Sequence, residues 1–74
     1  MKRSWTDGEI IDAFLRAWDR LKSGEELTFR RYTALHETDK QLPGTNTLRW
    51  GSRPGFAFYR DRSREIRLAV LATA

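Results

Sequence analysis

The sequence predicts a mainly α-helical fold of three short helices followed by a C-terminal β-hairpin, which would make the class α+β. Two observations predict the helices: apolar residues recur at helical spacing over residues 7–22, and residues that favour helix starts precede two later segments. A third observation, alternation of apolar and polar residues near the C-terminus, predicts the hairpin. With 74 residues, 39% of them hydrophobic, the chain can build one core, so we expect residues 1–74 to form a single small domain.

The first helix has the clearest signal. Thr6 and Glu9 have the spacing of a capping box, in which each side chain satisfies a backbone N–H of the other residue. The apolar stripe that follows ends at the Ser-Gly pair of residues 23–24, so we expect a helix over about residues 7–22. Its acidic first turn is explained by the helix dipole rather than by paired catalytic carboxylates.

The second helix is expected to begin at Thr28, whose hydroxyl can cap it, and to end before the Leu-Pro-Gly turn at 42–44. His36 is the only histidine and has no second ligand four residues later, so it forms no metal motif. We expect the core of the domain to include Ile10, Phe14, Leu21 and Leu35.

Residues 45–51 are expected to form a short recognition helix. Thr45 or Asn46 can cap this segment, Gly51 can end it, and Leu48 would face the first two helices. Hydroxyl, amide and guanidinium groups would then face outward, where they can read base edges and hold phosphates. This outward set comprises Thr45, Asn46, Thr47, Arg49 and Arg53. The sequence leaves open whether Trp50 is a core anchor or a base-stacking platform.

Two helices, a turn and a short polar third helix over residues 6–52 make a helix-turn-helix arrangement. The runs WTDGEIIDAFLRAW (5–18), LTFRRYTALH (27–36) and LPGTNTLRWGS (42–52) also resemble the homing-endonuclease-associated repeat, or HNH-associated repeat. Repeats of that family open with Trp or Tyr, enter the second helix through Leu-Thr, and pass a Leu-Pro turn before a third helix that ends near Phe-Gly-Ser-Trp. Here Trp50, Gly51 and Ser52 stand in place of Phe-Gly-Ser, no Trp follows, and Arg53, Pro54 and Gly55 replace the helical continuation.

The resemblance covers residues 5–52 and implies a trihelical DNA-binding unit. It implies DNA contact through the third helix, which corresponds here to Thr45, Asn46, Thr47 and Arg49. It implies no catalysis, because the sequence contains no HNH nuclease motif.

Residues 53–74 are expected to form an arginine-rich wing. Residues 56–60 and 65–70 have the pattern of two strands around a polar turn, DRSR. The alternative is a fourth helix over residues 55–72, which the Arg, Glu, Leu and Ala content favours, although Phe58 and Leu68 fall off its apolar stripe. In either geometry we expect Arg60, Arg62 and Arg64 to be exposed together.

The distribution of charge predicts a polyanionic partner. Residues 1–41 carry eight basic and eight acidic side chains, and the net charge of +4 lies wholly in residues 42–74, where every basic residue is an arginine. Guanidinium groups suit phosphate oxygens and guanine edges, so we expect duplex DNA as the partner. Such a protein would be a transcriptional regulator or an accessory factor in recombination or replication. The DNA-binding residues would be Thr45, Asn46, Thr47, Arg49, Arg53, Arg60, Arg62 and Arg64.

Two other functions stay open. One is a protein-binding inhibitor or adaptor anchored by tryptophans, and the other is an RNA-binding protein in which Trp50, Phe58 and Tyr59 stack on bases. With one His and no Cys, we expect no catalytic site, metal or cofactor. No stretch is long and apolar enough for a membrane span, so we expect a cytoplasmic protein, nucleoid-associated if it binds DNA. A homodimer or a protein partner would add to the modest stability of so small a core.

Overall fold

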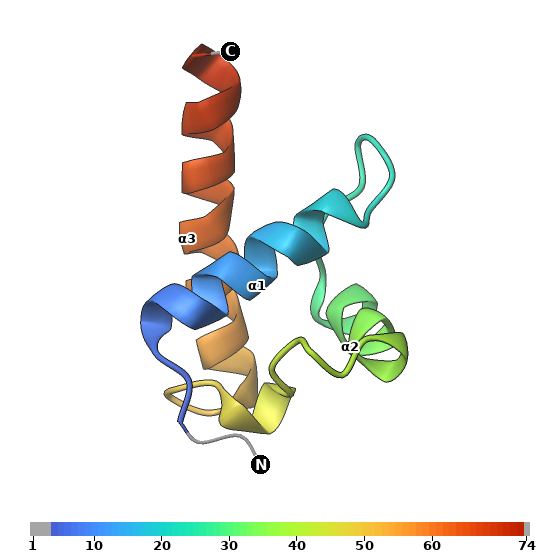
Figure 1. Ribbon diagram of the computed structural model, residues 1–74, viewed down its shortest axis with the longest axis vertical. Coiled ribbons are helices and arrows are strands. Elements are labelled where there is room, and N and C mark those ends of the chain that lie inside the picture. Colours follow the sequence, from blue (N-terminus) through green and yellow to red (C-terminus); the bar gives the residue numbers. More distant parts are fainter. Residues whose placement is uncertain (1–3, 74) are drawn as a thin grey trace.

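The computed structural model describes residues 4–73 and contains three α-helices and one 3-10 turn (Figure 1). Helix α1 covers Asp7–Asp19, α2 covers Phe29–Thr38, the 3-10 turn η1 covers Thr45–Thr47, and α3 covers Ser52–Thr73. The described residues form no strand. The mainly α-helical class is therefore confirmed, and the predicted β-hairpin wing is wrong.

Local capping chemistry starts the first two helices, as predicted. The Glu9 N–H donates to Thr6 Oγ1 at 3.1 Å and the Thr6 N–H donates to Glu9 Oε1 at 2.9 Å, which completes the capping box. The Arg31 N–H donates to Thr28 Oγ1 at 3.1 Å at the start of α2. Helix α1 ends at Asp19, three residues earlier than expected.

Helix α3 replaces the predicted wing and agrees with the alternative helix, although it is the third helix of the fold and begins at Ser52. Arg53, Pro54 and Gly55, which replace the helical continuation of the HNH-associated repeat, lie within this helix. Pro54 lies in the first turn, where its missing N–H costs nothing because that turn has no intrahelical acceptor. The alternating residues Ile66, Leu68 and Val70 are 41%, 57% and 61% exposed, so their alternation does not mark one buried face of a strand.

The core is largely aromatic and is centred on Phe14. The Phe14 ring stacks on Tyr32 at 4.7 Å between centroids and packs against Phe56 at 5.5 Å and Tyr59 at 6.0 Å. The Tyr32 hydroxyl donates to the carbonyl oxygen of Pro43, which ties the turn before η1 to α2. The buried apolar set is Ile10, Ala13, Phe14, Ala17, Trp18, Leu27, Tyr32, Leu42, Leu48, Phe56 and Tyr59.

Two of the four predicted core residues, Ile10 and Phe14, are fully buried. Leu21 and Leu35 are only partly buried and pack at the edge of the core. Leu48 is buried, as expected. No helix within residues 4–73 has the length and apolar character needed to cross a membrane.

Replacing Phe14 by Ala should cost about 3–5 kcal/mol, because the change empties the centre of the core. A domain of this size has little stability in reserve, so most of the variant should be unfolded at 25 °C. Thermal unfolding followed by circular dichroism measures the effect. Leu68→Ala, at an exposed position of α3, is the control and should change stability by less than about 0.5 kcal/mol. A Phe14→Ala variant that melts with the wild type would contradict this core assignment.

Candidate nucleic-acid interface

The segment predicted as a recognition helix contains only one 3-10 turn. The N–H and the hydroxyl of Thr47 both donate to the Gly44 carbonyl, at 3.0 and 2.6 Å. Leu48 then adopts an extended conformation and buries its side chain. The prediction of a recognition helix over residues 45–51 is therefore wrong. The Thr47 hydroxyl competes for local backbone groups, and the burial of Leu48 draws the chain away from a helical path.

Gly55 allows the chain after η1 to lie directly against the first turns of α3. A Cβ at this position would lie 2.1 Å from the Arg49 carbonyl oxygen and 2.9 Å from Leu48 Cβ, closer than any side chain permits. Gly51, with φ 84°, provides the turn into α3. The close approach at Gly55 thus fixes the path of residues 48–51.

Trp50 is held outward in a strained conformation. Its φ is 59°, in the left-handed region that a bulky residue rarely adopts, at a cost of roughly 1 kcal/mol. The residue is 60% exposed, and its ring packs edge-on against Phe58 at 4.6 Å between centroids. Trp50 is therefore not a core anchor. An exposed aromatic ring held by a strained backbone is typical of a binding surface.

Arg49 is exposed but oriented. Its Nη1 donates to Asp7 Oδ2 at 3.3 Å, and the other Asp7 oxygen accepts from the Tyr59 hydroxyl at 2.8 Å. Burial, together with the hydrogen bond to Asp7, raises the pKa of Tyr59 to about 12, so the phenol keeps its proton at neutral pH. Tyr59 therefore fixes Asp7, and Asp7 fixes the guanidinium of Arg49.

A groove of about 650 Å³ opens beside η1. Thr47 and Arg49 line it together with residues that are distant in sequence: Ser4, Trp5, His36, Lys40, Leu42, Pro43 and Gly44. Leu42 and Pro43 are buried, while Lys40 is exposed. None of the carboxylates described in the structure forms an ion pair with Lys40. The groove thus combines an apolar floor with a cationic wall.

We did not predict Trp5, His36 or Lys40 as site residues. They approach η1 only because the buried Leu42 and Pro43 fold the chain back after α2. A Cβ on Gly44 would lie 3.1 Å from Asn46 Oδ1 and 3.7 Å from the His36 ring, so this turn lies close to both polar groups. The only usable signal in the sequence was the Leu-Pro-Gly turn that begins two residues after Lys40.

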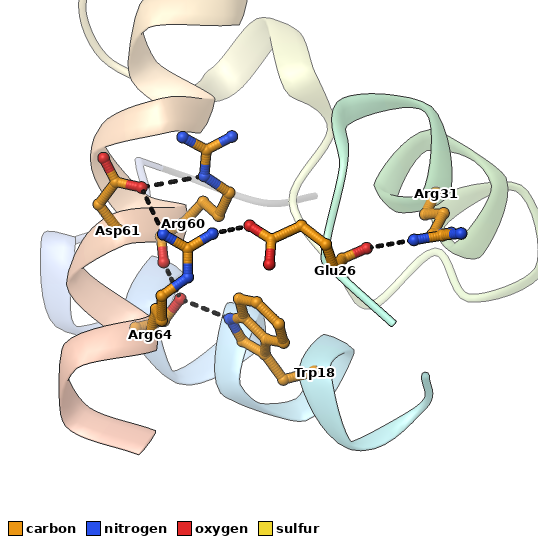
Figure 2. Close-up of polar contacts among 7 residues, drawn as sticks. Trp18, Glu26, Arg31, Arg60, Asp61 and Arg64 are labelled. Carbon is orange, nitrogen blue, oxygen red and sulfur yellow. Dashed lines mark hydrogen bonds and ion pairs between the residues drawn. The ribbon is translucent and has the colours of Figure 1, made fainter. Parts of the chain in front are cut away.

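Two arginines in the middle of α3, Arg60 and Arg64, pair with carboxylates of the same chain, and Arg64 reaches outside its own helix (Figure 2). Arg64 forms an ion pair with Glu26, in the loop before α2, and a second with Asp61 at 3.6 Å. Arg60 Nε donates to Asp61 Oδ1 at 3.0 Å. At the same level of α3, Trp18 Nε1 donates to the buried Ser63 hydroxyl at 2.9 Å. Helix α3 is therefore joined to α1 and to the loop before α2 by polar contacts.

Arg62 lies on a different side of α3 from Arg60 and Arg64. Residues two positions apart in a helix point about 160–200° away from each other, whereas Arg60 and Arg64 are one turn apart. Arg62 pairs with Glu65 at 3.8 Å, and its guanidinium lies 5.9 Å from the centre of the Phe58 ring. The expectation that the three arginines are exposed together is therefore wrong.

Arg53 remains available at the start of α3. It is exposed, its guanidinium stacks over Phe29 at 4.3 Å, and none of the described carboxylates pairs with it. Segment 45–53 as a whole lies at the end of the molecule opposite the C-terminus of α3 (Figure 1). Among the predicted site residues, the structure thus brings Asn46, Thr47, Arg49 and Arg53 to one exposed end, while Thr45 is half-buried.

Replacing Gly55 by Ala should destabilise the protein by more than about 2 kcal/mol, because the new methyl group would overlap a backbone oxygen that cannot move independently. Gly8→Ala is the matched control. Gly8 also lies in the first turn of a helix, but a Cβ there would have its closest contact at 4.0 Å. That variant should be as stable as the wild type or up to about 1 kcal/mol more stable. Urea unfolding measures the free energy of unfolding of both variants. Equal stabilities would refute the close approach of the Arg49 carbonyl to Gly55.

Comparisons with known proteins identify no family for this chain. No family model, curated protein or solved structure matches it. The resemblance to the HNH-associated repeat therefore remains a prediction from the sequence motifs.

Proposed function

We propose that this chain is a small non-enzymatic DNA-binding protein whose contact surface is the η1 end. We define that surface by segment 45–53 and Lys40. The observation that carries the proposal is a difference in how the cations are used. Arg60, Arg64 and Arg67 pair with carboxylates of the same chain, whereas Lys40 and Arg53 pair with none of the carboxylates described.

Cations without an internal partner are the ones most available to phosphates, and a paired cation contributes where its side chain stays largely exposed. Lys40 and Arg53 flank the segment on both sides in sequence, and Arg49 lies between them, oriented by Asp7 and still 62% exposed in its side chain. Phosphate oxygens at such groups release counterions, which is the main source of affinity for duplex DNA. Three cations around one exposed segment therefore suit contact with the DNA backbone.

Groups suited to base recognition lie among these cations. Asn46 is exposed on η1, and an amide side chain can bond the edge of adenine in both directions. Arg49 is able to make the corresponding contact with guanine. A single 3-10 turn presents fewer side chains than a full recognition helix, so the expected selectivity covers one or two base pairs.

Duplex DNA is favoured over single-stranded RNA by the positions of the aromatic residues. Stacking on RNA bases would require several accessible rings. Tyr59 is fully buried and bonded to Asp7, and Phe58 is half-buried against Trp50. Within the segment, only Trp50 presents a largely exposed ring.

Replacing Lys40 or Arg53 by Gln should weaken binding to all duplex sequences alike and reduce the dependence of log K on log salt by about 0.9 for each lost phosphate contact. Titration of a fluorescent duplex at two salt concentrations, with single-stranded DNA and RNA for comparison, measures this slope. Lys22→Gln is the matched control. Lys22 is exposed in the loop after α1. That loop lies away from η1 (Figure 1), so the substitution removes the same charge outside the proposed surface. Equal effects of Lys40→Gln and Lys22→Gln would show that only net charge matters and would exclude this surface.

Asn46→Ala and Arg49→Ala test selectivity instead of overall affinity. On the preferred site, found by selection from random duplexes, each change should cost about 1–3 kcal/mol of binding free energy. Binding to random duplex should change far less, so the preference at one or two base pairs should relax. A uniform loss on preferred and random duplexes would mean that both side chains contact only the backbone.

A further inference from the structure

Arg49 is held at both ends. Its carbonyl oxygen lies 2.1 Å from the place of a Cβ on Gly55, so its backbone is pressed directly against α3. Its guanidinium donates through Nη1 to Asp7 Oδ2 at 3.3 Å, and Asp7 belongs to the first turn of α1. The side chain of Arg49 is nevertheless 62% exposed. Arg49 is therefore an exposed arginine whose backbone and charged group both have fixed partners.

The carboxylate that holds this guanidinium is itself anchored in the core. The Tyr59 hydroxyl donates to Asp7 Oδ1 at 2.8 Å, and Tyr59 is fully buried. The Tyr59 ring packs against Phe14 at 6.0 Å and against Phe58 at 5.1 Å between centroids. Because the raised pKa of Tyr59 keeps the phenol protonated at neutral pH, the hydroxyl always donates. One oxygen of Asp7 thus has a fixed position, and the other is available to Arg49.

The three cations of the proposed surface differ in their partners. Lys40 and Arg53 pair with none of the described carboxylates. Arg49 pairs with Asp7, so from a distance the two opposite charges act nearly as a neutral pair and attract a phosphate less than a lone cation does. Arginine carries five N–H donors, and the contact with Asp7 is made by Nη1. The edge formed by Nε and Nη2 therefore keeps its parallel donors although much of the charge is cancelled.

We propose that Asp7 and Tyr59 determine the specificity of the η1 end, because they hold the guanidinium of Arg49 for a guanine edge and reduce its attraction for phosphates. This role rests on the proposed DNA binding. Guanine presents two acceptors in the major groove, O6 and N7, which match two parallel donors of one guanidinium. A side chain that is fixed before binding loses less conformational freedom on contact. Lys40 and Arg53 supply most of the attraction to the backbone, and Arg49 supplies selectivity.

The charge of Asp7 favours a base over a phosphate as the partner of Arg49. The side chain of Asp7 is 43% exposed, so a phosphate that approaches the guanidinium also approaches a like charge. That repulsion disfavours contact with the DNA backbone at this position. A guanine edge carries no net charge and meets no such repulsion. Tyr59 acts through Asp7, and Asp7 acts through Arg49, so both are positioning residues.

Asp7→Asn should separate affinity from selectivity. The substitution removes the charge but keeps a side-chain oxygen that can accept from the Tyr59 hydroxyl. Binding to random duplex should tighten about three- to tenfold at about 0.1 M salt, and the slope of log K against log salt should steepen by about 0.9, because Arg49 becomes free for one phosphate. The preference for the selected site over random duplex should fall at least about threefold, since a bidentate contact discriminates by roughly 5–150-fold. Titration of fluorescent duplexes at two salt concentrations measures both quantities.

Asp12→Asn is the matched control. Asp12 is exposed further along α1, and none of the cations described in the structure forms an ion pair with it. This variant should change random-duplex binding by less than about twofold, because salt screens a more distant charge, and should leave the preference intact.

Tyr59→Phe removes the hydrogen bond to Asp7 without changing any charge. Binding to random duplex should stay within about twofold of the wild type while the preference falls, because Asp7 no longer has a fixed position. In an Arg49→Ala background, Asp7→Asn should lower the preference no further, since both act through the same guanidinium.

The same titrations distinguish failure of this role from failure of the proposed function. A wild type that binds no duplex would overturn both. A wild type that binds duplex, with Asp7→Asn and Asp12→Asn equal in affinity and in preference, would overturn the specificity role alone. A measurement without DNA is the heteronuclear NOE of Arg49 Nε at pH 6, which should be close to that of the rigid backbone in the wild type and clearly lower in Asp7→Asn and Tyr59→Phe. Equal values in all three proteins would show that neither residue positions Arg49.

Discussion

The absence of a side chain at Gly55 is the constraint on which the rest of the structure depends. Because the Arg49 carbonyl lies where a Cβ would be, the chain leaving η1 lies directly against α3. That contact allows Leu48 to be buried and forces the following turn, with positive φ at Trp50 and Gly51. This turn places Arg49, Trp50 and Arg53 outside the core. The proposed DNA surface is thus a consequence of one backbone contact.

The arginines of the chain divide into two groups with different roles. Those in the middle of α3 pair with carboxylates of α1, of the loop before α2 and of α3 itself, and so replace part of the stabilisation that a larger core would supply. Exposed ion pairs contribute little individually, but Trp18 and Ser63 add a buried hydrogen bond at the same place. The excess of positive charge therefore overstates the number of groups available to a polyanion. Arg53 and Lys40 are more informative than the arginine-rich block.

Local signals in the sequence predicted the structure well, and signals that depend on distant contacts did not. The caps at Thr6 and Thr28 act within four residues, and both helix starts are correct. Pro54 could end a helix or open one, and only the packing of α3 on Phe14 decides between them. In the candidate site, the exposure of Asn46, Thr47, Arg49 and Arg53 was predictable. The separation of Arg62 from Arg64 depended on the helix, and the approach of Lys40 depended on the burial of Leu42.

The most direct test of the central claim is a map of the residues that contact duplex DNA, obtained from amide and indole chemical shifts in an NMR titration. We expect the largest shifts at Lys40, at residues 46–53 and at the indole N–H of Trp50. The indole of the buried Trp18 and the amides of Leu68 and Val70 should move little. Shifts concentrated on Arg60, Arg64 and Arg67 would contradict the division of the arginines, and no shift at saturating DNA would contradict the proposed function itself.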